Sequence, residues 1–194
     1  MDPLIAKLLF ALGYLVPIIA IRGPHIKAKK AQTFRQDTKV GSDTAAFVLT
    51  TVGNAFVPLL FIVSPVFWFA DYESPLWAGI VGAVLLIPGH WFFYRSHRDL
   101  GENWSPVLEV REGHTLVTGG IYRRIRHPMY TSVWLFVIAQ ALLLPNWIAG
   151  FGGLIPFTFL YFLRVGKEER LMLEEFGDEY AEYRKGTGRL FPKL

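Results

Sequence analysis

Three long stretches without a charged side chain constrain the fold of this chain more than any other feature of its sequence. No Asp, Glu, Lys or Arg occurs in residues 44–70, 74–94 or 127–163. About 20 helical residues cross the ~30 Å hydrocarbon core of a bilayer. The third stretch is too long for one crossing, and the turn pair Pro145-Asn146 divides it into two short helices. The sequence therefore predicts an all-α, polytopic membrane protein.

A fifth apolar segment begins the chain at residues 4–21 and contains one charge, Lys7, which can reach the interface. A signal peptide also places a lysine before an apolar stretch. Here, however, Arg22-Gly23-Pro24 follows the segment in place of a clean small-residue cleavage site, so we expect a retained helix. We predict a single membrane domain of residues 1–194 with five transmembrane helices, at about residues 4–21, 45–69, 75–94, 129–144 and 147–163.

Lys and Arg alternate between the segments that connect these helices. They are frequent in residues 22–39, 95–126 and 164–193, whereas the other two connections contain none. Because cytoplasmic loops are enriched in Lys and Arg, this alternation predicts an N-terminus outside and a C-terminus in the cytoplasm. Apolar residues of the tail recur at helical spacing, so we expect the fifth helix to continue as a cytoplasmic helical tail, with a break at Gly177.

The composition excludes several classes of site. The chain has no cysteine, which removes thiolate nucleophiles and thiolate metal ligands, and no other metal-binding constellation is visible. Basic cytoplasmic loops explain its net charge of +4, and no nucleic-acid recognition module is present. Three polar residues inside the spans are interpreted as interhelical hydrogen-bond partners: Asn54, His90 and Gln140.

The polar residues gather in two segments that this topology places on the cytoplasmic face. In the first, residues 114–117 lie between glycines that allow tight turns, and they can run extended and offer backbone groups to a flat heterocycle. Pro128 suits the first turn of a helix, whose N–H groups attract a carboxylate, and His127 and Tyr130 flank that turn. In the alternative interpretation, His127 only caps the helix and the neighbouring arginines anchor to anionic lipid headgroups.

In the second segment, Arg164 and Glu168 are four residues apart and so share one helix face. One interpretation is a simple ion pair at the membrane surface, worth about 0.3–0.5 kcal/mol. The other is a pair of site residues, because Arg164 lies at the inner edge of an apolar helix, where an unpaired charge is costly. The spacing alone leaves both interpretations open.

Five motifs in the second half of the chain occur in a characteristic order. They are His114-x-Leu116-Val117, Gly120-x-Tyr122, Arg126-His127-Pro128-x-Tyr130, Glu168-Glu169 and Phe176-Gly177-x-x-Tyr180-x-x-Tyr183. Together they resemble the isoprenylcysteine carboxyl methyltransferase family, within a wider group of small integral-membrane methyltransferases that includes phospholipid N-methyltransferases. The resemblance extends from about residue 97 to the C-terminus, and it is strongest for the short prokaryotic members, which have five membrane helices.

The resemblance implies a cofactor. The methyl donor would be S-adenosyl-L-methionine, with S-adenosyl-L-homocysteine as the product, bound at the cytoplasmic ends of the later helices without a Rossmann domain. The adenine end is assigned to His114, Thr115, Leu116 and Val117, and the pocket wall to Tyr122. The methionine part and the sulfonium are assigned to His127, Pro128, Met129 and Tyr130. A glutamine contact of the family, seven residues before the first motif, is replaced here by Val107.

The resemblance also implies two catalytic residues. Glu168 would pair with the ammonium group of the cofactor, and Arg164 would face the carboxylate of the acceptor. Methyl transfer from a sulfonium needs positioning and desolvation more than acid–base groups. A carboxylate acceptor is already a nucleophile at neutral pH, whereas an amine would need a base, for which Glu168, Glu169 and His127 are candidates. We expect a lipophilic carboxylate that enters from the bilayer, such as a prenylated cysteine C-terminus.

Other functions fit parts of the same sequence. The acceptor of a methyltransferase could also be a phospholipid amine or a small thiol. A non-catalytic lipid-binding scaffold would need the basic residues alone. A transporter would need charges or broken helices at mid-bilayer, whereas these spans carry no charge at mid-depth. The membrane would be the plasma membrane in a prokaryote and, by the family resemblance, the endoplasmic reticulum in a eukaryote.

Overall fold

The computed structural model describes residues 1–29, 41–101 and 115–193. Within these ranges the only β-type pairs are two isolated bridges, Asp71 with Asn146 and Ile125 with Gly188. The remaining order is helical, so the predicted all-α fold is confirmed. The helices are α1 (Pro3–Phe10), η1 (Ala11–Leu15), α2 (Val16–Lys29), α3 (Gly41–Thr51), η2 (Val52–Phe56), α4 (Val57–Val63), η3 (Trp68–Ala70), α5 (Leu76–Leu100), η5 (Gly120–Arg123), α6 (Pro128–Leu143), α7 (Trp147–Phe151) and α8 (Leu154–Gly186).

Four continuous helical stretches are long and apolar enough to cross a membrane: Pro3–Gly23, Thr44–Val63, Leu76–Leu100 and Trp147–Gly186. The prediction of a multi-pass membrane protein is thereby confirmed. The other apolar helix, α6, has 16 residues, fewer than the about 20 that a straight crossing needs. The count of five transmembrane helices therefore stays a prediction, as does the single domain of residues 1–194.

One predicted boundary is wrong, and one is confirmed. The second span was expected to reach residue 69, but α4 ends at Val63. Ser64 has extended backbone angles (φ −145°, ψ 156°) because it precedes Pro65, whose ring disfavours a helical conformation in the residue before it. The expected helical tail is present, since α8 continues to Gly186, and Gly177 breaks it with a φ of 53° that favours glycine.

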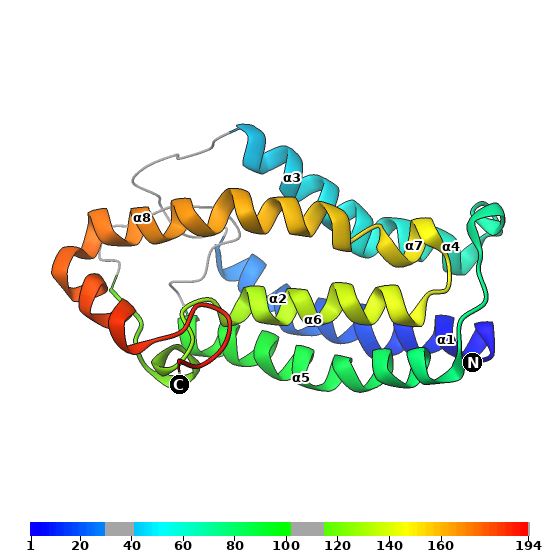
Figure 1. Ribbon diagram of the computed structural model, residues 1–194, viewed down its shortest axis with the longest axis horizontal. Coiled ribbons are helices and arrows are strands. Elements are labelled where there is room, and N and C mark those ends of the chain that lie inside the picture. The colour runs from blue at the N-terminus through cyan, green and yellow to red at the C-terminus, as the bar shows by residue number, and fades with distance from the viewer. Residues whose placement is uncertain (30–40, 102–114, 194) are drawn as a thin grey trace.

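The long helices run along the long axis of an elongated bundle, with α5 beside α6 and α3 beside α8 (Figure 1). The N-terminus lies at one end of this bundle and the C-terminus at the opposite end. The C-terminal end also holds the end of α5, η5 and the start of α6. We call it the basic end, after five arginines that lie in α5 and η5 or between η5 and α6: Arg95, Arg98, Arg123, Arg124 and Arg126.

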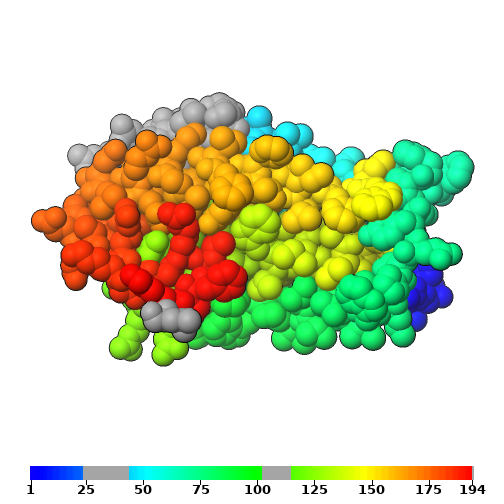
Figure 2. Space-filling model, in the orientation of Figure 1, coloured from blue at the N-terminus to red at the C-terminus, as the bar shows by residue number. Residues whose placement is uncertain are grey.

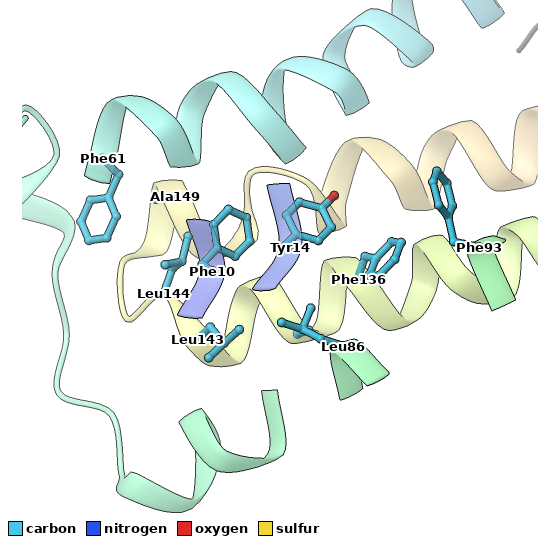
Figure 3. Close-up of a cluster of buried hydrophobic side chains, with 10 residues drawn as sticks. Phe10, Tyr14, Phe61, Leu86, Phe93, Phe136, Leu143, Leu144 and Ala149 are labelled. Atoms are coloured by element: carbon cyan, nitrogen blue, oxygen red, sulfur yellow. The ribbon is translucent and has the colours of Figure 1, made fainter. Parts of the chain in front are cut away.

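Aromatic side chains from separate helices fill the centre of the bundle (Figure 3). The ring of Tyr14 lies 5.1 Å from that of Phe136, which in turn lies 5.7 Å from that of Phe93. Phe10 and Phe136 are almost completely buried. Because lipid tails are as apolar as these side chains, the cluster stabilises the bundle through close packing rather than through release from water.

One buried amide and two glycines bring three helical segments into close contact. Gln140 of α6 donates from Nε2 to the carbonyl oxygens of Gly53 (2.9 Å) and Ala149 (2.7 Å), so its predicted role as an interhelical hydrogen-bond partner is confirmed. A Cβ atom on Gly53 would overlap the carbonyl oxygen of Gly152. Only glycine therefore permits this approach of η2 to the end of α7.

The other two polar residues of the spans behave differently. The Nδ1 atom of His90 lies 2.7 Å from the carbonyl oxygen of Leu86 in its own helix, so the predicted interhelical hydrogen bond is wrong for this residue. Its ring instead packs 4.9 Å from that of Phe136. Asn54 meets another helical segment, because its amide lies against Gly153, but its Oδ1 atom has no hydrogen-bond partner.

Candidate functional site

A cavity of about 400 Å³ opens between α2, α3, η2, α5, α6 and α8. Most of the residues predicted for the site line it: Thr115, Leu116, Val117, Tyr122, His127, Met129, Tyr130, Arg164 and Glu168. Pro128 is buried in the first turn of α6 and does not line the cavity. His114, like Val107, lies outside the described residues. Motifs that are far apart in the sequence therefore meet at one place, although their roles there stay a prediction.

The residues at the start of α6 form one part of the cavity wall. Pro128 stands at the first helical position, where its missing N–H costs no hydrogen bond. His127 occupies the N-cap position, but its side chain makes no capping hydrogen bond, so the interpretation of His127 as a helix cap is wrong. Its ring lies 5.6 Å from that of Tyr130 and faces the same side of the helix start.

Three side chains from two helices converge on the carboxylate of Glu168. The Tyr130 hydroxyl donates to Glu168 Oε1 at 2.6 Å, and a terminal nitrogen of Arg164 lies 3.2 Å from the same oxygen. His127 Nδ1 lies 3.5 Å from Glu168 Oε2. The ion pair between Arg164 and Glu168 is therefore present, but Arg164 is buried, with 8% of its surface exposed, so the pair does not lie on an exposed surface. Glu168 is instead the polar centre of the cavity wall.

The adjacent carboxylate, Glu169, points away from the cavity. It accepts hydrogen bonds from Arg126 and Arg189, and His127 Nε2 lies 3.4 Å from its Oε1 atom. The side chain of Arg126 is only 11% exposed, so for this arginine the interpretation as an anchor for lipid headgroups is wrong. The hydrogen bonds to Glu169 raise the pKa of the Arg189 guanidinium, so Arg189 stays charged.

Asp99 holds the turn that presents Tyr122 to the cavity, and no sequence motif had identified it. Its Oδ2 atom accepts from the backbone N–H of Ile121 at 2.8 Å and pairs with Arg95 at 3.1 Å. Gly120 has a φ of 59°, and a Cβ atom there would overlap this carboxylate. Burial raises the pKa of the Tyr122 hydroxyl far above its usual value, so Tyr122 stays neutral.

The cavity changes character as it extends into the bundle. Away from Glu168 its wall is aromatic and aliphatic, formed by Phe93, Val133, Phe136, Phe157 and Leu160. The opposite wall comes from the first half of the chain, which was not predicted to contribute: Tyr14, Ile18, Arg22, Phe47, Thr50, Thr51, Asn54 and Ala55. A charged region and an apolar region thus share one continuous space.

The comparisons with known proteins agree with the motifs. Residues 82–174 match the model of the isoprenylcysteine carboxyl methyltransferase (ICMT) family. The assignment to the ICMT family is confirmed. The chain is 29% identical over 129 residues to the human protein-S-isoprenylcysteine O-methyltransferase, covering 66% of this chain and 45% of that one. It is 30% identical over 137 residues to the protein of the same name from Dictyostelium discoideum, covering 66% of this chain and 56% of that one.

A solved structure shares the fold of this ICMT family chain. It is described as the eukaryotic intramembrane Ras methyltransferase ICMT, and it matches with a TM-score of 0.56 at 20% identity. The match covers 96% of this chain and 63% of that chain. The chain spans about half the length of the curated relatives that it matches, so the likeness establishes the architecture and leaves the activity to be argued from the site.

Proposed function

We propose that this chain is an S-adenosylmethionine-dependent membrane methyltransferase whose acceptor is a lipophilic carboxylate, such as the C-terminus of a prenylated cysteine. One observation carries the proposal: Tyr130, Arg164 and His127 converge on the carboxylate of Glu168, in the wall of a cavity that continues between apolar side chains. The names of the human and Dictyostelium relatives add the acceptor class, because both are protein-S-isoprenylcysteine O-methyltransferases.

The residues present fit this cofactor. A volume of about 400 Å³ lies within the usual range for small-molecule sites, about 300–1,000 Å³. The carboxylate of Glu168 can accept hydrogen bonds from an ammonium group, and the electron-rich face of Tyr130 suits a sulfonium cation. Residues 115–118 are not helical, and three of them (Thr115, Leu116 and Val117) line the cavity, where an adenine ring would contact them. When bound, S-adenosylmethionine supplies an electrophilic methyl group on a positively charged sulfur.

The chain itself has three tasks in such a reaction. Glu168 binds the amino-acid end of the donor, which fixes the donor at the polar end of the cavity. Arg164, with a planar guanidinium, can hold an acceptor carboxylate through two parallel hydrogen bonds and turn one of its oxygens toward the methyl group. Phe157 and Leu160 exclude water from the apolar part, where they would also contact the acceptor chain. A carboxylate acceptor needs no general base.

Binding and transfer can be tested in two steps. Calorimetric titration of the detergent-purified protein with S-adenosylhomocysteine should give saturable binding in the micromolar range. Label from S-[methyl-³H]adenosylmethionine should then pass to N-acetyl-S-farnesylcysteine but not to its methyl ester, which is a matched control because only the carboxylate is blocked. Absence of binding by folded protein would refute the proposal. Transfer to phosphatidylethanolamine in place of the farnesylcysteine would correct the acceptor class.

We also propose that the basic end faces the cytoplasm, with the N-terminus outside and five crossings in one domain. The alternation of basic connections and the opposite positions of the two termini support this orientation. The chain has no cysteine, so single-cysteine variants report cleanly. In intact cells, a membrane-impermeant maleimide should label Glu73→Cys, and Glu182→Cys should react only after lysis. The reverse pattern would invert the topology.

A further inference from the structure

Two adjacent glutamates of α8, Glu168 and Glu169, have different surroundings. Glu168 lines the cavity, whereas Glu169 does not and is 5% exposed. Glu169 Oε1 accepts from Arg126 Nε, from an Arg126 terminal nitrogen and from Arg189 Nε, each at 3.1 Å. Its Oε2 atom accepts from an Arg189 terminal nitrogen at 2.7 Å. With four donors on one carboxylate, Glu169 is a structural acceptor rather than a free base.

The segment that carries Arg189 is fastened to the start of α6. We call residues 187–190 the C-terminal strap. Its backbone pairs with the strand-like residues before α6: Arg126 N donates to the Gly188 carbonyl at 2.8 Å, and Gly188 N donates to the Arg124 carbonyl at 3.1 Å. One turn into α6, the Thr131 hydroxyl donates to the Leu190 carbonyl at 2.8 Å. In Figure 2 these C-terminal residues (red) lie against α8 (orange) and beside the start of α6 (yellow-green).

Arg189 reaches His127 by two routes. The backbone N–H of His127 donates to the Arg189 carbonyl at 3.0 Å. The Arg189 guanidinium holds Glu169, whose Oε1 atom lies 3.4 Å from His127 Nε2. The other ring nitrogen of His127 lies 3.5 Å from Glu168 Oε2, at the cavity. A residue near the end of the chain therefore fixes both the main chain and the ring of a cavity residue.

We infer that Arg189 and Glu169 are positioning residues of the methyltransferase site, and that the C-terminal strap holds the His127 turn in the geometry that binds the cofactor. The inference rests on the proposed function. Its physical basis is that the His127 ring makes no capping hydrogen bond to α6. The ring lies instead between the carboxylates of Glu168 and Glu169, and the His127 backbone N–H is bonded to the C-terminal strap. A displacement of about 1 Å at such a position is enough to impair a site that works by orientation.

The test compares three variants of the full-length protein. Arg189→Gln removes the charge and the paired hydrogen bonds, Arg189→Lys keeps the charge but not the fork geometry, and Lys185→Gln removes a nearby exposed charge as the matched control. Arg189→Gln should raise the dissociation constant for S-adenosylhomocysteine about fivefold to tenfold. This is less than the loss of a direct charge-assisted hydrogen bond to the cofactor would give, because Arg189 acts through His127. Arg189→Lys should fall between, and Lys185→Gln should match the parent.

A second readout separates positioning from mere anchoring of the tail. Hydrogen–deuterium exchange should be faster in residues 125–131 of Arg189→Gln than in the parent. Exchange in the first half of α5, which is the half farther from the basic end, should stay the same. Exchange in residues 125–131 and cofactor affinity that both match the parent would overturn the inference. So would a lower melting temperature with unchanged affinity in the folded protein, because that is the result of a purely structural strap. Glu169→Gln should reproduce both effects if Arg189 acts through Glu169.

The two proposals can fail separately. If the parent binds S-adenosylhomocysteine and Arg189→Gln binds it equally well, the positioning role is refuted and the methyltransferase function stands. If the parent binds none, the proposed function is refuted, and the exchange of residues 125–131 alone decides whether Arg189 fixes the His127 turn.

Discussion

Removing the charge of Glu168 should weaken cofactor binding with little change in the shape of the site. The Glu168→Gln substitution keeps the side-chain length and an oxygen that can still accept from the Tyr130 hydroxyl, now 2.6 Å away. What it removes is the negative charge offered to the cofactor's ammonium group. A hydrogen bond to a charged group contributes about 1.5–3 kcal/mol, which corresponds to an about 10- to 150-fold change in dissociation constant.

The surroundings of Glu168 narrow the expected range of this change in dissociation constant. The side chain of Glu168 is 22% exposed, so water screens it only in part. The same Oε1 atom also faces Arg164 at 3.2 Å, which shares the negative charge with any bound ammonium. We therefore expect Glu168→Gln to raise the dissociation constant for S-adenosylhomocysteine about tenfold, at the lower limit for a hydrogen bond to a charged group. Glu168→Ala, which also leaves the Tyr130 hydroxyl without its acceptor, should approach a hundredfold.

The assay is calorimetric titration in detergent, with Glu175→Gln as the control, because Glu175 is an exposed carboxylate of the same helix. Thermal unfolding measured in parallel shows whether each variant is folded. The loss of its pairing with Arg164 should lower the midpoint of Glu168→Gln by about 2–4 °C per kcal/mol lost. Unchanged affinity in folded Glu168→Gln would remove Glu168 from the cofactor site and refute the assignment of its role.

Three further predictions concern the acceptor, the packing and the turn before the site. Arg164→Lys should slow methyl transfer to a carboxylate acceptor at least tenfold while the affinity for S-adenosylhomocysteine changes little, since one ammonium group cannot replace the two parallel hydrogen bonds of a guanidinium. If transfer assays and calorimetry show equal losses of rate and affinity, Arg164 has a structural role. Gly53→Ala should lower the free energy of unfolding by about 1–3 kcal/mol or more, because its Cβ would overlap Gly152. In the control Gly166→Ala the added Cβ meets no atom, so this variant should not be destabilised. Equal melting temperatures of the two variants would disprove the close approach of Gly53 to Gly152. Asp99→Asn should weaken cofactor binding severalfold by loosening η5. An affinity equal to that of the parent would show that η5 keeps its conformation without the Asp99 carboxylate.

The helices could be predicted from the sequence because a bilayer permits few backbone conformations. Backbone N–H and C=O groups in hydrocarbon must pair within the segment, so a long run without charges is a helix regardless of its neighbours. The same rule does not fix where a helix ends. The second span stops at Val63 because Pro65 follows, a local constraint that the absence of charges until residue 71 conceals.

The motifs predicted which residues meet, but not which of Glu168 and Glu169 faces the cavity and which pairs with the arginines. Successive residues of an α-helix point about 100° apart, so Glu168 and Glu169 cannot both face one cavity. Which of them does so depends on partners that are distant in sequence. Arg189 reaches Glu169 only because α8 breaks at Gly177 and the chain returns to the start of α6.

The contribution of the first half of the chain could not be predicted for a related reason. Tyr14, Ile18 and Arg22 are spaced four residues apart and so lie on one helix face, and this face lines the cavity. In an apolar span the opposite face is equally hydrophobic, so the sequence does not reveal which side meets α6 and which meets lipid. Tertiary packing, here the contact of Tyr14 with Phe136, decides the orientation.

The position of the cavity suits one proposed ligand that comes from water and another that comes from the lipid bilayer. A charged donor is soluble in water and a prenylated acceptor in lipid, so they can meet only where a polar lining joins an apolar one. Charges are costly at mid-bilayer, which confines Glu168 and Arg164 to the basic end of their helix. Tyr130 joins the two linings: its hydroxyl binds Glu168, and its ring packs at 5.4 Å against the ring of Tyr161 and at 6.2 Å against that of Phe157. The first turn of α6 is therefore where the polar and apolar parts of the cavity meet, and the C-terminal strap holds this turn.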